Sequence, residues 1–243
     1  MKNIVYILLI SVLSLLYSCE SKSDSESNSS GKGGSLARFA LVGDVLYTVD
    51  EYNLNVFSIE DPANPLFIKK ISLGIGIETI FSHNSELFVG SNDGMYIYDI
   101  EVPLAPAQLS KYEHVVSCDP VVVDEQYAYV TLHGGSGRCW RSVNELQILD
   151  ISDLRRPRLV NRYDMLEPKG LAIENKTLFL CDSGLKVFDV SDVNKIKLLK
   201  NFKIKAEDVI YNHGHLYVIG EKGLYQYLYS DTITLLSEMK IAE

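Results

Sequence analysis

Short runs of alternating apolar and polar residues fill the chain after residue 35. This period of two is typical of β-strands that pack at least one face into a core, and Gly, Asp, Asn and Pro separate the runs as they do in turns. The pattern therefore predicts an all-β fold.

One strand pattern recurs five times, at a spacing of about 40 residues. Its copies are LYTVD (46–50), LFVGS (87–91), AYVTL (128–132), LFLCD (178–182) and LYVIG (216–220). A repeat of this length that is carried by strands indicates a β-propeller.

Each repeat is expected to form four short antiparallel strands, which are 38–42, 46–50, 55–59 and 66–72 in the first copy. We predict five blades with the boundaries 36–74, 75–114, 115–165, 166–205 and 206–243. The repeat begins with an inner strand and ends with an outer strand at 234–241, so no blade is completed by both ends of the chain. Either the first and last blades pack face to face, or a partner covers an open edge.

The second position of the recurring strand is always aromatic: Tyr47, Phe88, Tyr129, Phe179 and Tyr217. Such a column suits either an aromatic ligand platform or packing between blades. We favour packing, because neighbouring sheets meet face to face about 10 Å apart and need large side chains at fixed positions.

The N-terminus has the features of a bacterial signal peptide. Lys2 precedes an apolar run from residue 4 to 16, which is shorter than the roughly 20 residues of a membrane span. The following Leu-Tyr-Ser-Cys resembles a lipobox, so we expect removal of residues 1–18 and a lipid on Cys19. An ordinary signal peptide followed by an incidental cysteine is the alternative.

Residues 19–35 are rich in Ser, Gly and acidic residues and contain almost no apolar side chains, which predicts a disordered tether. Glu20, Asp24 and Glu26 resemble the charged signals that route some lipoproteins of Bacteroidota to the cell surface, but a solubilising linker has the same composition. We expect attachment to the bacterial outer membrane through the lipid alone, on either its periplasmic or its extracellular face.

The formal net charge is −9, and no basic stripe is present. This balance argues against nucleic acid and against an anionic membrane surface as ligands.

Two of the remaining cysteines, Cys118 and Cys139, belong to the third repeat. Cys118 opens an inner strand, and Cys139 lies in a loop at the same edge of the same sheet. In an oxidising compartment we predict a disulfide that closes a loop of about 20 residues and contributes about 3 kcal/mol. Two unrelated free thiols are the alternative. Cys181 lies in the recurring strand and should be buried and inert.

The loop at 133–145 is the one large insertion in the repeat pattern. It carries His133, Arg138, Trp140 and Arg141, and Trp and Arg are enriched at interaction hot spots. The insertion suits either a binding loop or a plug that shields a blade edge.

Charged residues recur where the inner strands begin. Glu78, Asp119, Lys169 and Glu207 should surround one mouth of the central channel, on the side of the insertion. Three carboxylates within about 5 Å of one point would suit Ca²⁺. Alternatively these are ordinary solvated strand ends, with Lys169 paired to Glu207.

Three segments resemble the LVIVD-repeat family of surface lipoproteins: CDPVVVDEQYAYVTLHGGSGRC (118–139), NELQILDISDLRRPRLV (144–160) and GLAIENKTLFLCDSGLKVFDVSD (170–192). The likeness weakens in the last repeat, where Leu228 replaces the aspartate found at Asp99, Asp150 and Asp189. The resemblance implies a β-propeller and an envelope location, but no shared activity.

No motif of a known catalytic class occurs in the sequence. Our leading hypothesis is therefore a non-enzymatic module that binds a protein or glycan partner at the cell envelope and needs no cofactor. The alternative is a metal-dependent hydrolase or lyase of the propeller type that uses Glu78, Asp119 and Glu207.

Overall fold

The computed structural model describes residues 33–114, 120–134 and 143–241. Twenty β-strands make up its secondary structure. The first two sheets contain β1 (Phe39–Val42), β2 (Val45–Val49), β3 (Asn53–Ser58), β4 (Leu66–Ser72), β5 (Ile77–His83), β6 (Glu86–Ser91), β7 (Gly94–Asp99) and β8 (Ala107–Glu113). The third contains β9 (Val121–Val123), β10 (Tyr127–Leu132), β11 (Glu145–Asp150) and β12 (Arg158–Asp164). The last two contain β13 (Pro168–Glu174), β14 (Thr177–Asp182), β15 (Leu185–Asp189), β16 (Lys197–Phe202), β17 (Ala206–Asn212), β18 (His215–Gly220), β19 (Gly223–Tyr229) and β20 (Ile233–Lys240).

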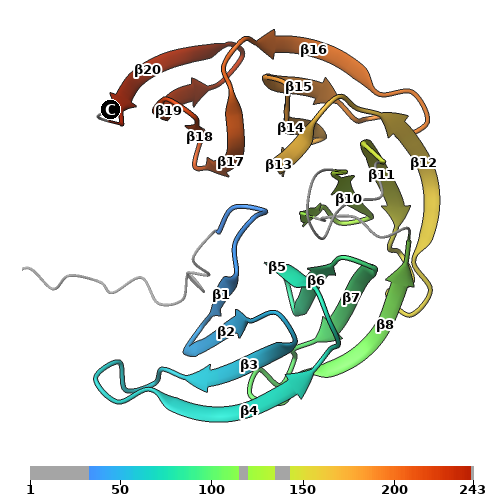
Figure 1. Cartoon of the computed structure of the whole chain (residues 1–243), viewed down its shortest axis with the longest axis vertical. Helices are drawn as coiled ribbons and strands as arrows, with labels where there is room; N and C mark the ends of the chain where they lie inside the picture. Colours follow the sequence, from blue (N-terminus) through green and yellow to red (C-terminus); the bar gives the residue numbers. More distant parts are fainter. Residues whose placement is uncertain (1–32, 115–119, 135–142, 242–243) are drawn as a thin grey trace, which may run out of the picture.

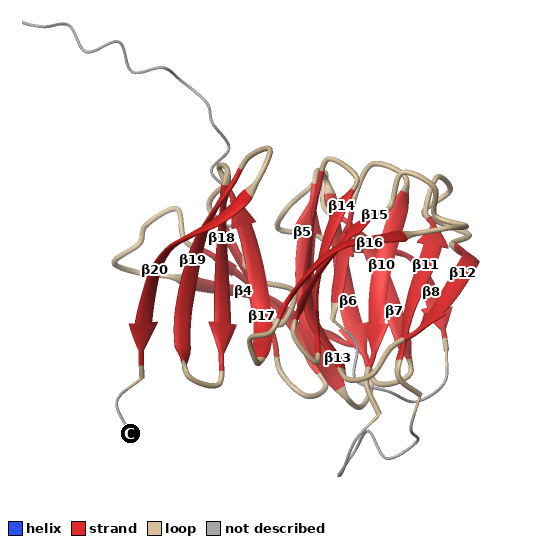
Figure 2. Cartoon of the chain, turned by 90° about the horizontal axis from the view of Figure 1, so that it is seen from above, coloured by secondary structure: helices blue, strands red, loops and turns tan. Residues whose placement is uncertain are grey.

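These strands form five sheets of four antiparallel strands, each in sequence order. We number the sheets blades 1 to 5. The first strand of each blade lies nearest the centre and the fourth lies at the rim (Figure 1). Seen edge-on, the loops gather at the two ends of the strands (Figure 2). The predicted all-β propeller of five four-stranded blades is therefore confirmed. The described residues include no helix of the length and hydrophobicity that crossing a bilayer requires.

Every blade has two faces, which we name by their neighbours. The leading face looks toward the preceding blade in the sequence, and the trailing face looks toward the following one. Four apolar clusters fill the four junctions between consecutive blades. At the junction of blades 4 and 5, for example, Phe179 and Cys181 of β14 pack with Leu216 and Val218 of β18. Packing between blades therefore makes up the core.

The aromatic column serves this packing, as the sequence predicted. Tyr47, Phe88, Tyr129 and Phe179 lie on trailing faces and are almost fully buried. The ring of Phe179 meets that of Tyr229 in blade 5 edge-on, at 5.1 Å between centroids. Tyr217 occupies the same column in blade 5 but is only partly buried, because no blade follows it.

The recurring aspartate after the third strand has a local role. The carboxylates of Asp99, Asp150 and Asp189 each accept a hydrogen bond from the backbone N–H two residues further on, at 2.8, 2.9 and 2.9 Å. Such bonds fix the turn to the outer strand. Leu228 stands at this position in blade 5, and its side chain has no acceptor for such a bond.

The ring is open between blade 5 and blade 1 (Figure 1). On the leading face of blade 1, Phe39 and Phe67 are 55% and 56% exposed. On the trailing face of blade 5, Ile219 and Met239 are 49% and 69% exposed. The sequence allowed either face-to-face packing of the first and last blades or an open edge that a partner covers. The structure does not show face-to-face packing of blades 1 and 5.

Replacing equivalent aromatic residues in a closed and in an open junction tests this architecture. Phe179→Ala should reduce the free energy of unfolding by about 3–5 kcal/mol, because it leaves a cavity between blades 4 and 5. Tyr217→Ala removes a side chain of similar size from the open face and should cost less than about 1 kcal/mol. Urea unfolding of both variants measures the difference. Equal losses would show that the trailing face of blade 5 is covered in the isolated protein.

Candidate functional site at the channel mouth

Three of the four predicted mouth residues lie at matching positions, each the second residue of an inner strand. Glu78 belongs to β5, Lys169 to β13 and Glu207 to β17. This common register places them at the same end of the channel. Asp119 lies outside the described residues.

Lys169 is held by two carboxylates. Its Nζ lies 2.8 Å from Oε1 of Glu207 and 3.2 Å from Oε1 of Glu167. Partial burial on its own would lower the pKa of Lys169, but hydrogen bonds to Glu207 and Glu167 outweigh this and raise it. The pairing of Lys169 with Glu207, one of the two expectations from the sequence, is thus observed.

Glu78 lies apart from this pair, between blades 1 and 2. It lines a hollow of about 400 Å³ together with Arg38, Glu51 and Thr79. Within the described ranges, no three His, Cys, Asp or Glu side chains are grouped closely enough to hold a metal ion. Because Asp119 lies outside the described residues, the predicted cation site of Glu78, Asp119 and Glu207 stays a prediction.

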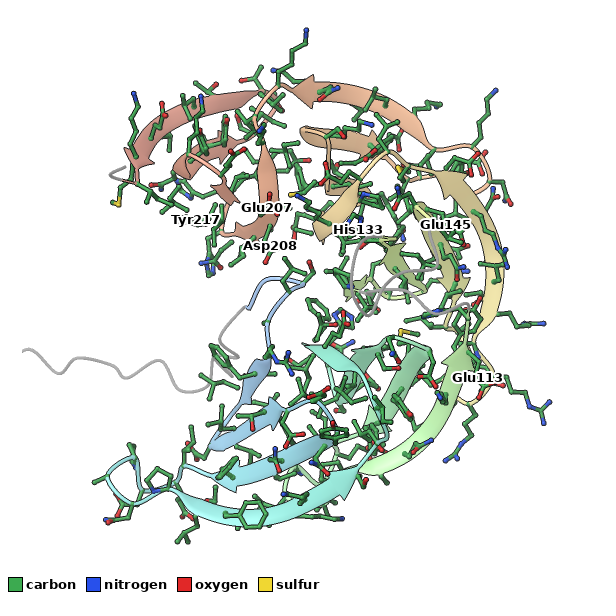
Figure 3. All side chains as sticks on the ribbon, viewed as in Figure 1. Glu113, His133, Glu145, Glu207, Asp208 and Tyr217 are labelled. Atoms are coloured by element: carbon green, nitrogen blue, oxygen red, sulfur yellow. The ribbon has the colours of Figure 1, made fainter. Side chains whose placement is uncertain are left out.

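The base of the insertion is fixed by Asn144. Its side-chain oxygen accepts a hydrogen bond from the backbone N–H of Gly134 at 2.9 Å, and its Nδ2 donates one to the carbonyl of Leu166 at 2.7 Å. The insertion is thereby attached to the segment that leads into β13, beside the channel mouth. Of its predicted binding residues only His133 is described (Figure 3). Arg138, Trp140, Arg141 and the predicted Cys118–Cys139 disulfide lie outside the described residues.

A buried aspartate fixes the backbone next to the channel mouth. Asp182, at the end of β14, is fully buried and pairs with Lys186 at 2.6 Å. Its Oδ1 accepts hydrogen bonds from the backbone N–H groups of Leu166 and Glu167, at 2.9 and 2.6 Å. These bonds hold Glu167 where it meets Lys169. In the sequence, Asp182 was part of the recurring strand and gave no sign of this role.

Cys181, the neighbour of Asp182, is fully buried between blades 4 and 5, as predicted. Burial raises the pKa of its thiol, which suits an unreactive core residue.

The end of the predicted tether is part of the fold. Ser35 is 1% exposed, and its hydroxyl accepts a hydrogen bond from the N–H of Leu171 at 2.8 Å and donates one to Asp208 at 3.2 Å. The expectation of a disordered tether as far as residue 35 is therefore wrong for its last residues. We call this contact of Ser35 with β13 and β17 the N-terminal clasp.

Asp208 is the unusual group of the clasp (Figure 3). Burial raises its pKa to about 6, although hydrogen bonds from Val209, Ser35 and Leu36 oppose the shift. Two glycines make room for its carboxylate: a Cβ on Gly34 or on Gly170 would collide with it. Sequence reasoning missed this site, because a serine in a Ser/Gly-rich stretch carries no signal of burial.

A second hollow, of about 250 Å³, lies at the other end of the channel. The inner strands of blades 2 to 5 surround it, and Gly33 and Ser35 form one wall. Its polar groups include His83, Asp124 and Glu174, which lie near the turns between first and second strands. Asp124 forms a salt bridge there with Lys176, at 2.9 Å. Because Ser35 lines this hollow and is also bonded to β13 and β17, the N-terminal clasp lies inside the channel, between its two ends.

The raised pKa of Asp208 predicts a pH-dependent stability. A folded-state pKa of about 6, against an ordinary value of 3.8, means that the folded protein binds this proton more tightly than the unfolded chain does. The associated stability is present below pH 3.8 and is lost as the pH rises toward 6. Asp208→Asn keeps the shape without the charge, so its free energy of unfolding should exceed that of the wild type by up to about 3 kcal/mol above pH 6.

Urea unfolding of both proteins between pH 4 and pH 7.5 measures this effect. The difference between variant and wild type should grow across the interval and then level off. A constant difference would show that Asp208 does not titrate in this range.

Comparison with known proteins places the chain among propellers. Residues 140–165, in blade 3, match the model of the LVIVD repeat. No curated protein matches the chain.

Among solved structures, a periplasmic gluconolactonase of Pseudomonas aeruginosa shares its fold with a TM-score of 0.63 at 12% identity, over 82% of this chain and 68% of that one. A protein from Lactobacillus plantarum gives 0.66 at 12%, over 82% and 69%, and one of unknown function from Desulfotomaculum acetoxidans gives 0.64 at 13%, over 82% and 67%. At these identities the likeness shows the fold alone: the chain is a β-propeller with a segment similar to the LVIVD repeat.

Proposed function

We propose that this protein is a lipid-anchored protein of the bacterial outer membrane whose propeller is a non-enzymatic module that binds a protein partner. The observation that carries the proposal is the pair of open blade faces. Such faces are buried at all four internal junctions, whereas in blades 1 and 5 they expose Phe39, Phe67, Ile219 and Met239. Exposed apolar surface of this kind is typical of interaction sites.

The chemistry of these faces favours a protein over a glycan. The trailing face of blade 5 presents Tyr217, Ile219, Leu224, Leu228 and Met239, which carry no charge. The central part of a protein interface is apolar and poor in charged residues, and its aromatic and Met side chains are enriched. The same face also carries the polar side chains His215, Gln226 and Ser237, and the hydroxyl of Ser237 is hydrogen-bonded to Gln226.

The channel mouth is less suited to the alternative, a metal-dependent hydrolase or lyase. Glu207 is already neutralised by Lys169, and Glu78 lies in a separate hollow. The likeness to a gluconolactonase concerns the fold, which hosts many unrelated functions. No arrangement of the described residues favours the hydrolytic reaction over binding.

The anchor follows from the sequence. Cys19 ends a lipobox-like segment, and the residues after it are polar. A flexible chain of about 15 residues has a root-mean-square reach of about 20 Å, which would hold the propeller close to the membrane without fixing it rigidly. Stable attachment requires more than one acyl chain, as bacterial lipoproteins have.

Removing the lipidation site tests the anchor. Full-length protein with Cys19→Ala should move from the membrane pellet to the soluble fraction of its host cell, and mass spectrometry should show no lipid at the N-terminus. Cys181→Ala, which changes a buried cysteine, is the matched control and should stay in the membrane. A Cys19→Ala variant that remains bound to the membrane would exclude lipid as the anchor.

Changing the open face tests the binding role. Extracted from the envelope in mild detergent, the wild-type protein should sediment as an assembly larger than the monomer. Leu228→Asp puts a charge on the open face and should abolish this assembly, because a buried unpaired charge is costly. Leu199→Asp, at an exposed position on β16, should leave it intact. Sedimentation of the wild type as a monomer would refute the proposed function.

A further inference from the structure

The trailing face of blade 5 repeats a surface that is buried elsewhere. The strand pairing aligns Ile210, Tyr217, Ile219 and Leu224 of blade 5 with Ala172, Phe179, Cys181 and Leu185 of blade 4. The four residues of blade 4 are at most 7% exposed, because β17 and β18 cover them. The trailing face of blade 5 therefore has the side chains that, in blade 4, pack against the leading face of the next blade.

The leading face of blade 1 shows the complementary case. Leu46 of β2 stands where Leu87, Leu178 and Leu216 stand in blades 2, 4 and 5, and those three are fully buried. Phe57 and Phe67 meet edge-on at 5.5 Å on this face, and Phe67 remains mostly exposed. The leading face of blade 1 therefore has the apolar side chains that, in other blades, pack against the trailing face of the preceding blade.

The two open faces are held apart at the centre. Ser35 bonds to Leu171 and Asp208, and Gly34 lies against Asp208 and Ile210 on the inner part of blade 5. The N-terminal clasp therefore separates the inner edges of the two faces. Collapse of blade 1 onto blade 5 would require this clasp to leave.

The extent of the opening also bears on whether a second copy of the chain fills it. Figure 1 shows that the five blades span a longer arc than the opening does. A second copy could bring a blade to this position only with its four other blades attached. In the solved structures that share this fold, about one third of each chain has no counterpart here.

We infer that the opening between blades 5 and 1 is a docking site for a blade-type β-sheet of another polypeptide, apolar on both faces, whose leading face packs on Ile219 and Met239 and whose trailing face packs on Phe39 and Phe67. This inference rests on the proposed function and names the class of partner that the protein binds. The spacing is that of stacked sheets, about 10 Å from face to face.

Methionine oxidation provides a native footprint of the site. Met239 is 69% exposed on the open face, whereas Met95 is fully buried between blades 2 and 3 and serves as the internal control. In intact membranes treated with dilute hydrogen peroxide, Met239 should oxidise at least about tenfold more slowly than in the purified monomer, because the docked sheet covers it. Met95 should stay unoxidised in both samples.

A photo-crosslinking amino acid at position 219 identifies the occupant, with position 199 as the control. The inference requires a position-219 adduct, absent at position 199, whose peptides come from a protein of repeated β-strands. An adduct with a protein of any other class overturns it.

A gap-filled variant tests the same surface without the natural partner. One further copy of residues 166–205, joined after residue 243, supplies a blade whose leading face is known to fit a trailing face. This variant should protect Met239 about tenfold and raise the melting temperature. The control variant carries Asp in the added copy at the positions of Leu178 and Leu180, and it should do neither.

The outcomes separate this inference from the binding role. If oxidation of Met239 in the purified protein becomes slower as the protein concentration rises, the occupant is a second copy of the chain. If oxidation is slow at every concentration, the ring closes on itself. Either result overturns the inference. Equal oxidation rates of Met239 in membranes and in the purified protein also overturn the inference. In that case the binding role survives if the detergent-extracted protein still sediments as a large assembly. If that assembly is absent, the binding role fails together with the inference.

Discussion

The structure depends on one constraint: a blade of this fold has two apolar faces and can bury them only against other blades. Five blades in a row form four junctions, and each junction holds one apolar cluster. The aromatic column supplies the largest fully buried side chain to each junction. Because the row does not close, two faces remain without a neighbour, and they leave Phe39, Phe67, Ile219 and Met239 exposed to solvent.

The fold was predictable from the sequence because its determinants are local and repeated. A period of two within strands and a period of about 40 residues between them required no knowledge of distant contacts. The same holds for Asp99, Asp150 and Asp189, whose carboxylates bind N–H groups two residues away. Strand boundaries were less exact: the second strand of blade 1 runs from Val45 to Val49 rather than over 46–50.

The candidate site was predictable only in part. The register of the inner strands placed Glu78, Lys169 and Glu207 at one end of the channel, but the sequence alone did not decide between an ion pair and a cation site. The contact of Ser35 with Asp208 joins residues 173 positions apart. Nothing in the repeat indicates it, because Ser35 precedes the first strand and Asp208 differs from its counterparts in the other inner strands. Such irregular, long-range contacts are the part of a repeat protein that its repeat does not encode.

The N-terminal clasp also determines where a force on the N-terminus would enter the fold. Gly33 and Ser35 line the hollow formed by the turns near His83 and Glu174, at the end of the channel opposite Lys169 and Glu207. If Cys19 carries a lipid, as we propose, a pull from the membrane would enter the fold near that end. Because Ser35 is bonded to Leu171 and Asp208, tension along the tether would reach blades 4 and 5 before it reached β1.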